Sequence, residues 1–222
     1  VGAAVLPLMA ARARAVDPFG DKLTHDLLVG LGATGALGSL LLIALAEPLT
    51  RVVGGPELAG ASHSLTLLAP TGVVLLVAIP LGTTYLALGR GRRYLHFNAL
   101  ALLFNVVANA AFTLPFGIDA AARITWATEL AVAAAASLPL WRRDSGARHT
   151  ALGLTGLLAL VVAGSELAAA GADPRIVAGA GALVILALTG GRLRCMLGAL
   201  RRPSAQGVGA LEVAAGEEQI DG

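Results

Sequence analysis

The feature of this sequence that most constrains its fold is the repetition of apolar runs long enough to cross a membrane as helices. A hydrocarbon core about 30 Å thick requires roughly 20 apolar residues per helix. Only 14% of the residues are charged, whereas about a quarter are charged in soluble domains. We expect an all-α, polytopic transmembrane helix bundle with six complete spans. The expected spans are Leu27 to Ala46, Leu65 to Leu88, Leu95 to Pro115, Ala120 to Trp141, Ala151 to Ala170 and Ile176 to Gly191.

The two ends of the chain differ from these runs. Val1 to Ala10 is apolar but too short to span, and Arg12 and Arg14 follow it, the reverse of a secretory signal. We interpret this stretch as the end of a seventh membrane helix and expect the chain to be a fragment. Residues 203–222 lack long apolar runs and carry four carboxylates, so we expect a disordered cytoplasmic tail. Residues 1–202 then form one transmembrane domain.

The basic residues alternate between loops, as the positive-inside rule requires of real spans. Arg51 and Arg175 fall on one side, and Arg123 lies near the start of the fourth span. We expect the side with the many basic residues to be cytoplasmic, which places a multi-pass protein in the cytoplasmic (inner) membrane with its carboxyl terminus inside. The net charge of only +2 does not suggest a nucleic-acid partner. The thirteen basic residues on the cytoplasmic side are Arg12, Arg14, Lys22, Arg90, Arg92, Arg93, Arg142, Arg143, Arg148, Arg192, Arg194, Arg201 and Arg202.

Polar residues inside the third and fourth spans are the candidate substrate-binding groups. Asn105 and Asn109 are four residues apart and share a helical face, so they predict either hydrogen bonds between helices or an amide-lined cavity. Glu129 lies near the middle of the fourth span, where a carboxylate is expensive and usually functional or paired. Arg123 lies six residues earlier, on a different face. Glu166 is near the outer end of the fifth span, where we expect it to be solvated.

Small residues and prolines predict how two of the spans pack and bend. Gly30, Gly32, Gly35, Gly38 and Ser39 make the first span a packing helix, because small side chains let membrane helices approach closely. The second span contains Pro70 and Pro80. Each proline removes a backbone donor, so we expect this helix to be bent or locally opened. The bend is either a static kink or a hinge.

The chain lacks the patterns of catalytic and metal sites. Its four histidines are scattered at or near loops without metal-ligand spacing, and the single Cys195 cannot form a multi-thiolate site. No nucleophile has a nearby base in the sequence. We therefore expect no metal, no cofactor and no enzymatic activity. The Gly-Arg-Gly-Arg-Arg segment, residues 89–93, reads as a positively charged turn at the membrane surface that attracts anionic headgroups.

The stretch Ala87 to Glu129 resembles the polysaccharide and lipid-linked oligosaccharide flippases of the multidrug/oligosaccharidyl-lipid/polysaccharide exporter superfamily. The similarity is diffuse and covers most of residues 5 to 141. The opening of this region, Val5 to Ala15, is similar to the end of a family helix in which a proline is followed by apolar residues and then a basic one. The matching elements of the main stretch are the turn Leu86 to Arg90, the spaced Asn105 and Asn109, the turn Pro115 to Ile118, and the polar pair Thr128 and Glu129.

One position departs from the family pattern. The family commonly has Gly-Ala-Ala after the turn, whereas this chain has Asp119, Ala120 and Ala121. A carboxylate is tolerable there because the amino terminus of a helix carries partial positive charge. The resemblance implies twelve to fourteen helices in two lobes around a central cavity, with this chain as the carboxyl-terminal lobe plus two helices. It also implies a missing amino-terminal lobe or a partner.

Together these features predict an integral membrane flippase that moves a lipid-linked oligosaccharide or polysaccharide precursor by alternating access, with membrane lipids as its surroundings. Two alternatives remain open. The first is a cation-coupled multidrug exporter in which Glu129 holds the proton or cation. The second is a noncatalytic membrane subunit that scaffolds a complex of glycan synthesis enzymes.

Overall fold

The computed structural model describes residues 22–58, 60–87, 89–141 and 145–201. Within these residues the fold is all-α, as expected, with seven α-helices, one short 3-10 helix and no strand. The apolar stretch Val1 to Ala10 and the tail 203–222 lie outside the described residues. The elements are α2 (Lys22–Gly54), η1 (Pro56–Leu58), α3 (Ala61–Leu68), α4 (Thr71–Ala87), α5 (Gly91–Phe116), α6 (Ile118–Trp141), α7 (Ser145–Ala169) and α8 (Pro174–Arg201).

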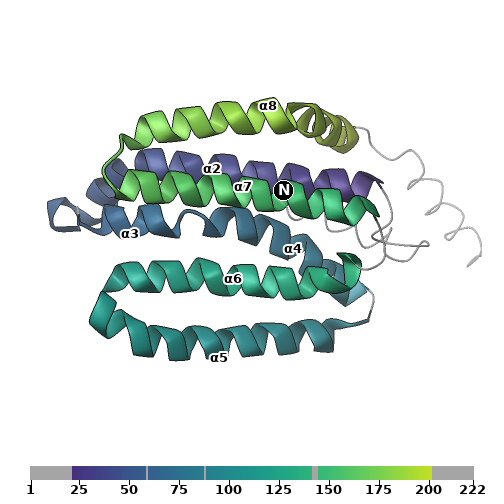
Figure 1. Ribbon diagram of the computed structural model, residues 1–222, viewed down its shortest axis with the longest axis horizontal. Helices are drawn as coiled ribbons and strands as arrows, with labels where there is room; N and C mark the ends of the chain where they lie inside the picture. The colour runs from purple at the N-terminus through teal and green to yellow at the C-terminus, as the bar shows by residue number, and fades with distance from the viewer. Residues whose placement is uncertain (1–21, 59, 88, 142–144, 202–222) are drawn as a thin grey trace, which may run out of the picture.

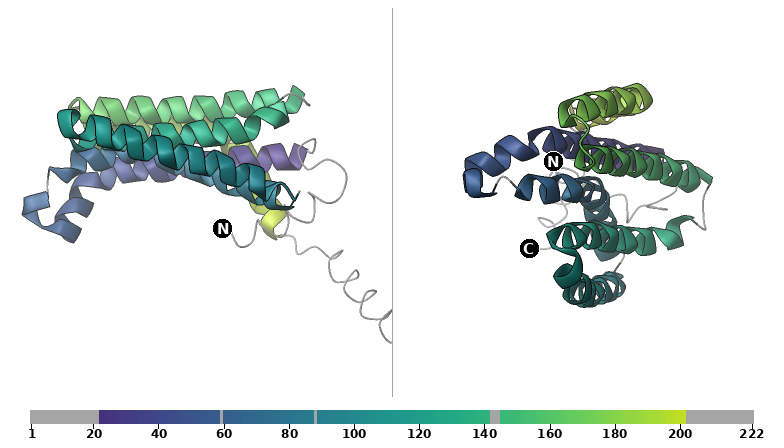
Figure 2. Two further views of the ribbon diagram at one scale, coloured as in Figure 1. Left: turned by 90° about the horizontal axis from the view of Figure 1, so that it is seen from below. Right: turned by 60° about the vertical axis from the view of Figure 1, so that its left-hand side comes forward.

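The long helices lie side by side and run alternately in opposite directions (Figure 1). Across the bundle, α8 comes first, then α2 with α7, then α3 and α4, then α6, and α5 forms the opposite edge (Figure 2). The start of α2, the end of α4, the start of α5, the end of α6, the start of α7 and the end of α8 lie at one end of the bundle, which we call the basic end. It contains Arg90, Arg92 and Arg93 beside the start of α5, Arg148 in the first turn of α7, and Arg192, Arg194 and Arg201 in the last turns of α8.

Four of the described helices are long and apolar enough to cross a membrane: α2, α5, α7 and α8. A fifth span is formed if α3 and α4 are taken together as one bent helix pair. These helices indicate a membrane protein. The remaining expected span, the fourth, corresponds to α6, which carries three charged residues, Asp119, Arg123 and Glu129, and is not among the four.

Helix α2 is the packing centre of the bundle, because it contacts α3, α4, α7 and α8. Gly35 explains how α4 comes so close: a Cβ atom at this position would lie 2.6 Å from the carbonyl oxygen of Gly72 and 2.9 Å from the Cα of Val73. The predicted packing helix is therefore present, although Gly38 faces open space. The core that surrounds α2 comprises Ala33, Ala36, Leu40, Ile43, Ala69, Val73, Leu157, Val161, Ala178 and Ile185.

The first predicted span ends too early, because α2 continues beyond Ala46 and through Pro48 to Gly54. Proline removes one helical hydrogen bond, and local contacts support the turn around it. The hydroxyl of Thr50 donates to the carbonyl of Ala46 at 3.0 Å, and Arg51 pairs with Glu47 at 2.6 Å. The helix ends where Gly55 adopts φ +70°, a conformation that favours glycine and commonly terminates helices.

The second predicted span is bent at one of its two prolines. Helices α3 and α4 meet at an angle of 40° across the break at Ala69 and Pro70. Helix α4 runs through Pro80 without a break. The expected bend is therefore present at Pro70, and both residues of the break are buried.

Candidate functional site

Helix α6 takes part in polar side-chain contacts with four other helices. Ser64 of α3, Tyr85 of α4 and Asn105 of α5 donate hydrogen bonds to it. Its own Arg123 donates to Glu166 of α7. The α4 contact is the hydroxyl of Tyr85, which donates to the carbonyl of Ala136 at 2.9 Å. The polar groups of this region therefore centre on α6 and on α5, its hairpin partner.

Asn105 and Asn109 form a hydrogen-bonded ladder along α5. The amide nitrogen of Asn109 donates to the side-chain oxygen of Asn105 at 3.0 Å, and Thr113 donates to the oxygen of Asn109 at 3.2 Å. The prediction that the two asparagines share one face is confirmed. The ladder reaches α6, because the amide nitrogen of Asn105 donates to the hydroxyl of Thr128 at 3.3 Å.

The ladder keeps hydrogen-bonding capacity beyond its internal contacts. A side-chain amide offers two donors and an oxygen that accepts two hydrogen bonds. Asn105 and Asn109 are half-buried, whereas Thr128 is buried and donates its own hydroxyl to the carbonyl of Ile124 at 2.7 Å. The two amides could therefore bind hydroxyl or phosphate oxygens while the threonine anchors them to α6.

Glu129 follows Thr128 in the middle of α6 and is half-buried. Among the described residues it forms no hydrogen bond or ion pair. Arg123 does not approach it, since that guanidinium is engaged elsewhere. Glu129 is thus the chain neighbour of Thr128, the residue at which the asparagine ladder meets α6. Arg123 contacts neither Glu129 nor the ladder.

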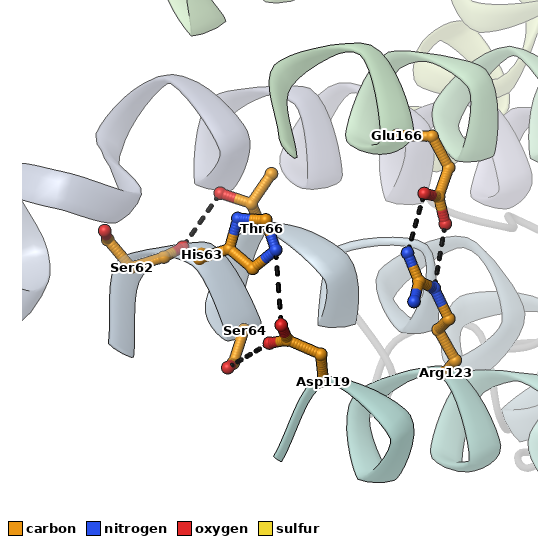
Figure 3. A network of polar contacts seen from close by, with 7 residues as sticks. All are labelled: Ser62, His63, Ser64, Thr66, Asp119, Arg123 and Glu166. Atoms are coloured by element: carbon orange, nitrogen blue, oxygen red, sulfur yellow. Dashed lines mark hydrogen bonds and ion pairs between the residues drawn. The ribbon is translucent and has the colours of Figure 1, made fainter. Parts of the chain in front are cut away.

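Arg123 forms a two-pronged ion pair with Glu166 of α7 (Figure 3). Its Nε donates to Oε1 at 3.1 Å and its Nη2 donates to Oε2 at 2.8 Å. The side chains remain 49% and 45% exposed, as expected for a carboxylate near the outer end of its helix. This pair fastens α6 to α7 at the end of the bundle opposite to the basic end.

Asp119 joins α3 to the first turn of α6, a contact that the sequence analysis missed (Figure 3). Its carboxylate accepts a hydrogen bond from the Ser64 hydroxyl at 2.6 Å and faces Nε2 of His63 at 3.3 Å. The only local signal was the position of Asp119 at a helix amino terminus. The partners are more than fifty residues away in the chain and lie on a helix of eight residues.

Among the described residues, no three His, Cys, Asp or Glu side chains come together in a group that could hold a metal ion. The group formed by Asn105, Asn109, Thr128 and Glu129 offers neutral amides, a hydroxyl and one carboxylate. Such groups can bind polar parts of a ligand and can exchange a proton.

No family model, curated protein or solved structure matches this chain.

Proposed function

We propose that this chain is part of an integral membrane transporter that moves a lipid-linked oligosaccharide or polysaccharide precursor across the cytoplasmic membrane. Three observations support the proposal: the apolar helices, the polar groups of the hairpin formed by α5 and α6, and the resemblance of residues 87–129 to lipid-linked oligosaccharide flippases.

The proposal depends most on one observation, the polar stretch within the hairpin of α5 and α6. It is formed by Asn105, Asn109, Thr128 and Glu129. A carboxylate at the centre of a bilayer is unfavourable by about 3 kcal/mol or more on insertion scales. It persists where water, a ligand or another helix surrounds it. A transporter cavity supplies such surroundings, and amides beside a carboxylate are suited to sugar hydroxyl groups.

In this proposal, α2, the bent pair α3 and α4, α5, α6, α7 and α8 form six spans, with the basic end in the cytoplasm. The polar head of the substrate passes through a water-filled cavity while its lipid tail stays in the bilayer, so that no polar group meets hydrocarbon unaided. The break at Pro70 lets α3 and α4 move relative to one another as the cavity opens to alternate sides, and Pro80 gives α4 a second flexible point. A second lobe, supplied by further sequence or by a partner protein, completes the cavity.

A cation-coupled exporter of small molecules is the second candidate, and the unpaired state of Glu129 among the described residues favours it. A carboxylate without a protein partner is free to bind and release a proton or a cation during the transport cycle. Drug-stimulated proton release by the purified protein, without movement of lipid-linked sugar, would identify this function.

The test is flipping of a fluorescent lipid-linked oligosaccharide in vesicles that contain the full-length protein. The fraction of substrate that a membrane-impermeant quencher reaches is measured over time. We expect Glu129→Gln and Asn109→Ala to slow flipping at least tenfold, since each removes a polar group of the proposed cavity. Glu47→Gln is the matched control, because Glu47 is an exposed carboxylate paired with Arg51 in the next turn of α2.

Unchanged flipping in both site variants would show that these residues are not the substrate site. No flipping in the wild-type protein, with its second lobe present, would refute the transport proposal itself.

A further inference from the structure

The turn that joins α4 to α5 carries exposed positive charge that has no counter-charge among the described residues. Arg90, Arg92 and Arg93 are exposed, and no Asp or Glu occurs in residues 58–118. Among the described residues, Arg90 and Arg92 form no ion pair with any other part of the bundle. Arg93 is held over the ring of Phe97, with its guanidinium carbon 5.7 Å from the ring centroid.

Aromatic side chains lie directly beside these arginines and join α4 to α5. Tyr85 stacks on Tyr94, with ring centroids 5.7 Å apart, and meets Phe97 edge to face at 6.4 Å. Tyrosine is enriched where membrane proteins cross the boundary between headgroups and hydrocarbon. Tyr85 is only 4% exposed and anchors the cluster within the bundle. We therefore expect the partly exposed Tyr94 and Phe97, and the neighbouring arginines, to lie at the headgroup level.

Beyond this cluster, α5 presents an apolar surface that the other described helices do not cover. Only 6% of its apolar stretch is buried, compared with 61% for α2. Leu95 and Leu103 are 66% and 61% exposed. Leu86, at the end of α4, is 65% exposed. An occupant with an anionic head and apolar chains would match both the arginines and these leucines.

We propose that the α4–α5 turn binds the phosphate of an anionic phospholipid, with Arg90 and Arg92 as its ligands and the acyl chains lying along the exposed leucines of α5. Arginine binds phosphate oxygens through its planar fork of donors. The amino terminus of α5 adds partial positive charge, and its first turn contains no acidic residue. The proposal goes beyond the transport function: it requires only that α5 faces lipid, whatever the cargo.

The experiment compares the lipids that lie next to the two ends of α5. A reporter variant, Leu95→Trp, is made in a background with Trp126→Phe and Trp141→Phe, and Leu114→Trp provides the matched reporter at the far end of α5, where Leu114 is 92% exposed. The full-length protein is placed in phosphatidylcholine vesicles that contain brominated phosphatidylglycerol or brominated phosphatidylcholine. Tryptophan quenching then gives the relative binding constant of the two lipids at each reporter.

We expect phosphatidylglycerol to be preferred about fivefold at the Leu95→Trp reporter and not at the Leu114→Trp reporter. The preference should fall to about one in Arg90→Gln/Arg92→Gln and remain in Arg90→Lys/Arg92→Lys, which keeps the charge. In the protein that keeps Arg90 and Arg92, the preference should also decline as salt is added. This measurement does not depend on how the arginine variants fold. Arg51→Gln/Arg175→Gln, at the opposite end of the bundle, should leave it unchanged.

Equal preferences at the two reporters, or a preference that survives both salt and the glutamine substitutions, would overturn the proposal. The last measurement adds a polyprenyl phosphate as a competitor. If it displaces brominated phosphatidylglycerol more effectively than an equal amount of unbrominated phosphatidylglycerol does, the turn binds the transported class of lipid, and the assignment to a bilayer phospholipid is wrong. Loss of flipping activity has no bearing on these readouts, so this proposal and the transport proposal can fail separately.

Discussion

Helices α2 and α5 are similarly apolar but occupy opposite positions in the bundle. Their most apolar stretches have mean hydropathies of 2.1 and 1.8, yet 61% of the first is buried and only 6% of the second. Hydropathy determines whether a helix can lie in a membrane, because lipid and protein interiors are equally apolar. It does not determine which of the two surrounds the helix. The difference in burial between α2 and α5 indicates that side-chain size and polar contacts determine which helices pack against each other.

The two regions are also held in place by different interactions. Around α2, small residues allow close packing, and from Leu28 to Gly54 the described side-chain hydrogen bonds stay within the helix. The hairpin of α5 and α6 is attached to α3, α4 and α7 through polar contacts of Asp119, Arg123 and Ala136. Its own two helices are joined by the hydrogen bond between Asn105 and Thr128. Changes of volume should therefore matter most at α2, and changes of polarity at α6.

The largest expected effect is the contrast between two leucine truncations. Leu40 of α2 is 2% exposed and packs against α7 and α8, whereas Leu103 of α5 is 61% exposed. We expect Leu40→Ala to lower the free energy of unfolding by about 2–5 kcal/mol. Leu103→Ala should change it by less than about 0.5 kcal/mol. Reversible unfolding in mixed micelles, followed by circular dichroism, measures both. Equal losses would mean that α5 is covered by protein.

The next effect comes from adding one methyl group at two glycines of α2. Gly35→Ala places a Cβ 2.6 Å from the carbonyl oxygen of Gly72, so α2 and α4 must separate. We expect a loss of about 1–3 kcal/mol in the same unfolding measurement. Gly38→Ala is the matched control, with no heavy atom within 4 Å, and should be neutral or stabilise by up to about 1 kcal/mol. Tolerance of Gly35→Ala would show that the close helix approach is not required.

A smaller effect is expected for the hydrogen bond that attaches α5 to α6. Thr128→Val keeps the shape of the side chain and removes the hydroxyl that accepts from Asn105. A double-mutant cycle with Asn105→Ala should give a coupling of about 0.6 kcal/mol, the average for hydrogen bonds between membrane helices. Additive effects of the two substitutions would mean that the asparagine ladder stabilises α5 alone and does not reach α6.

The smallest effect is expected for the ion pair between Arg123 and Glu166. Both side chains are nearly half exposed, so solvent weakens their attraction. A cycle of Arg123→Gln and Glu166→Gln should give a coupling of about 0.2–1 kcal/mol that decreases as salt is added. A larger coupling that is independent of salt would show that this end of the bundle is shielded from water.

Much of the helical layout was predictable from local patterns. The apolar runs place the centre of every long helix, and the spacing of Asn105 and Asn109 predicts their shared face. Prolines were a weaker guide. Four prolines lie in or between α2 and α4. Pro56 begins η1 just after the end of α2, and Pro70 lies at the break between α3 and α4. Pro48 and Pro80 lie inside continuous helices. The loss of one backbone donor is a local penalty, and the surrounding contacts decide whether the helix bends.

The sequence by itself determined that the chain forms apolar helices and that its arginines gather between alternate pairs of them, because helix length and charge position are properties of single segments. Only the tertiary structure decided that, within the described part of the chain, α2 is largely buried while α5 is largely exposed. It also decided that Asp119 meets His63 and Ser64, and that Arg123 pairs with Glu166 and not with Glu129. These contacts join residues more than forty positions apart, and such pairings depend on which helices pack together, a choice that no local pattern encodes.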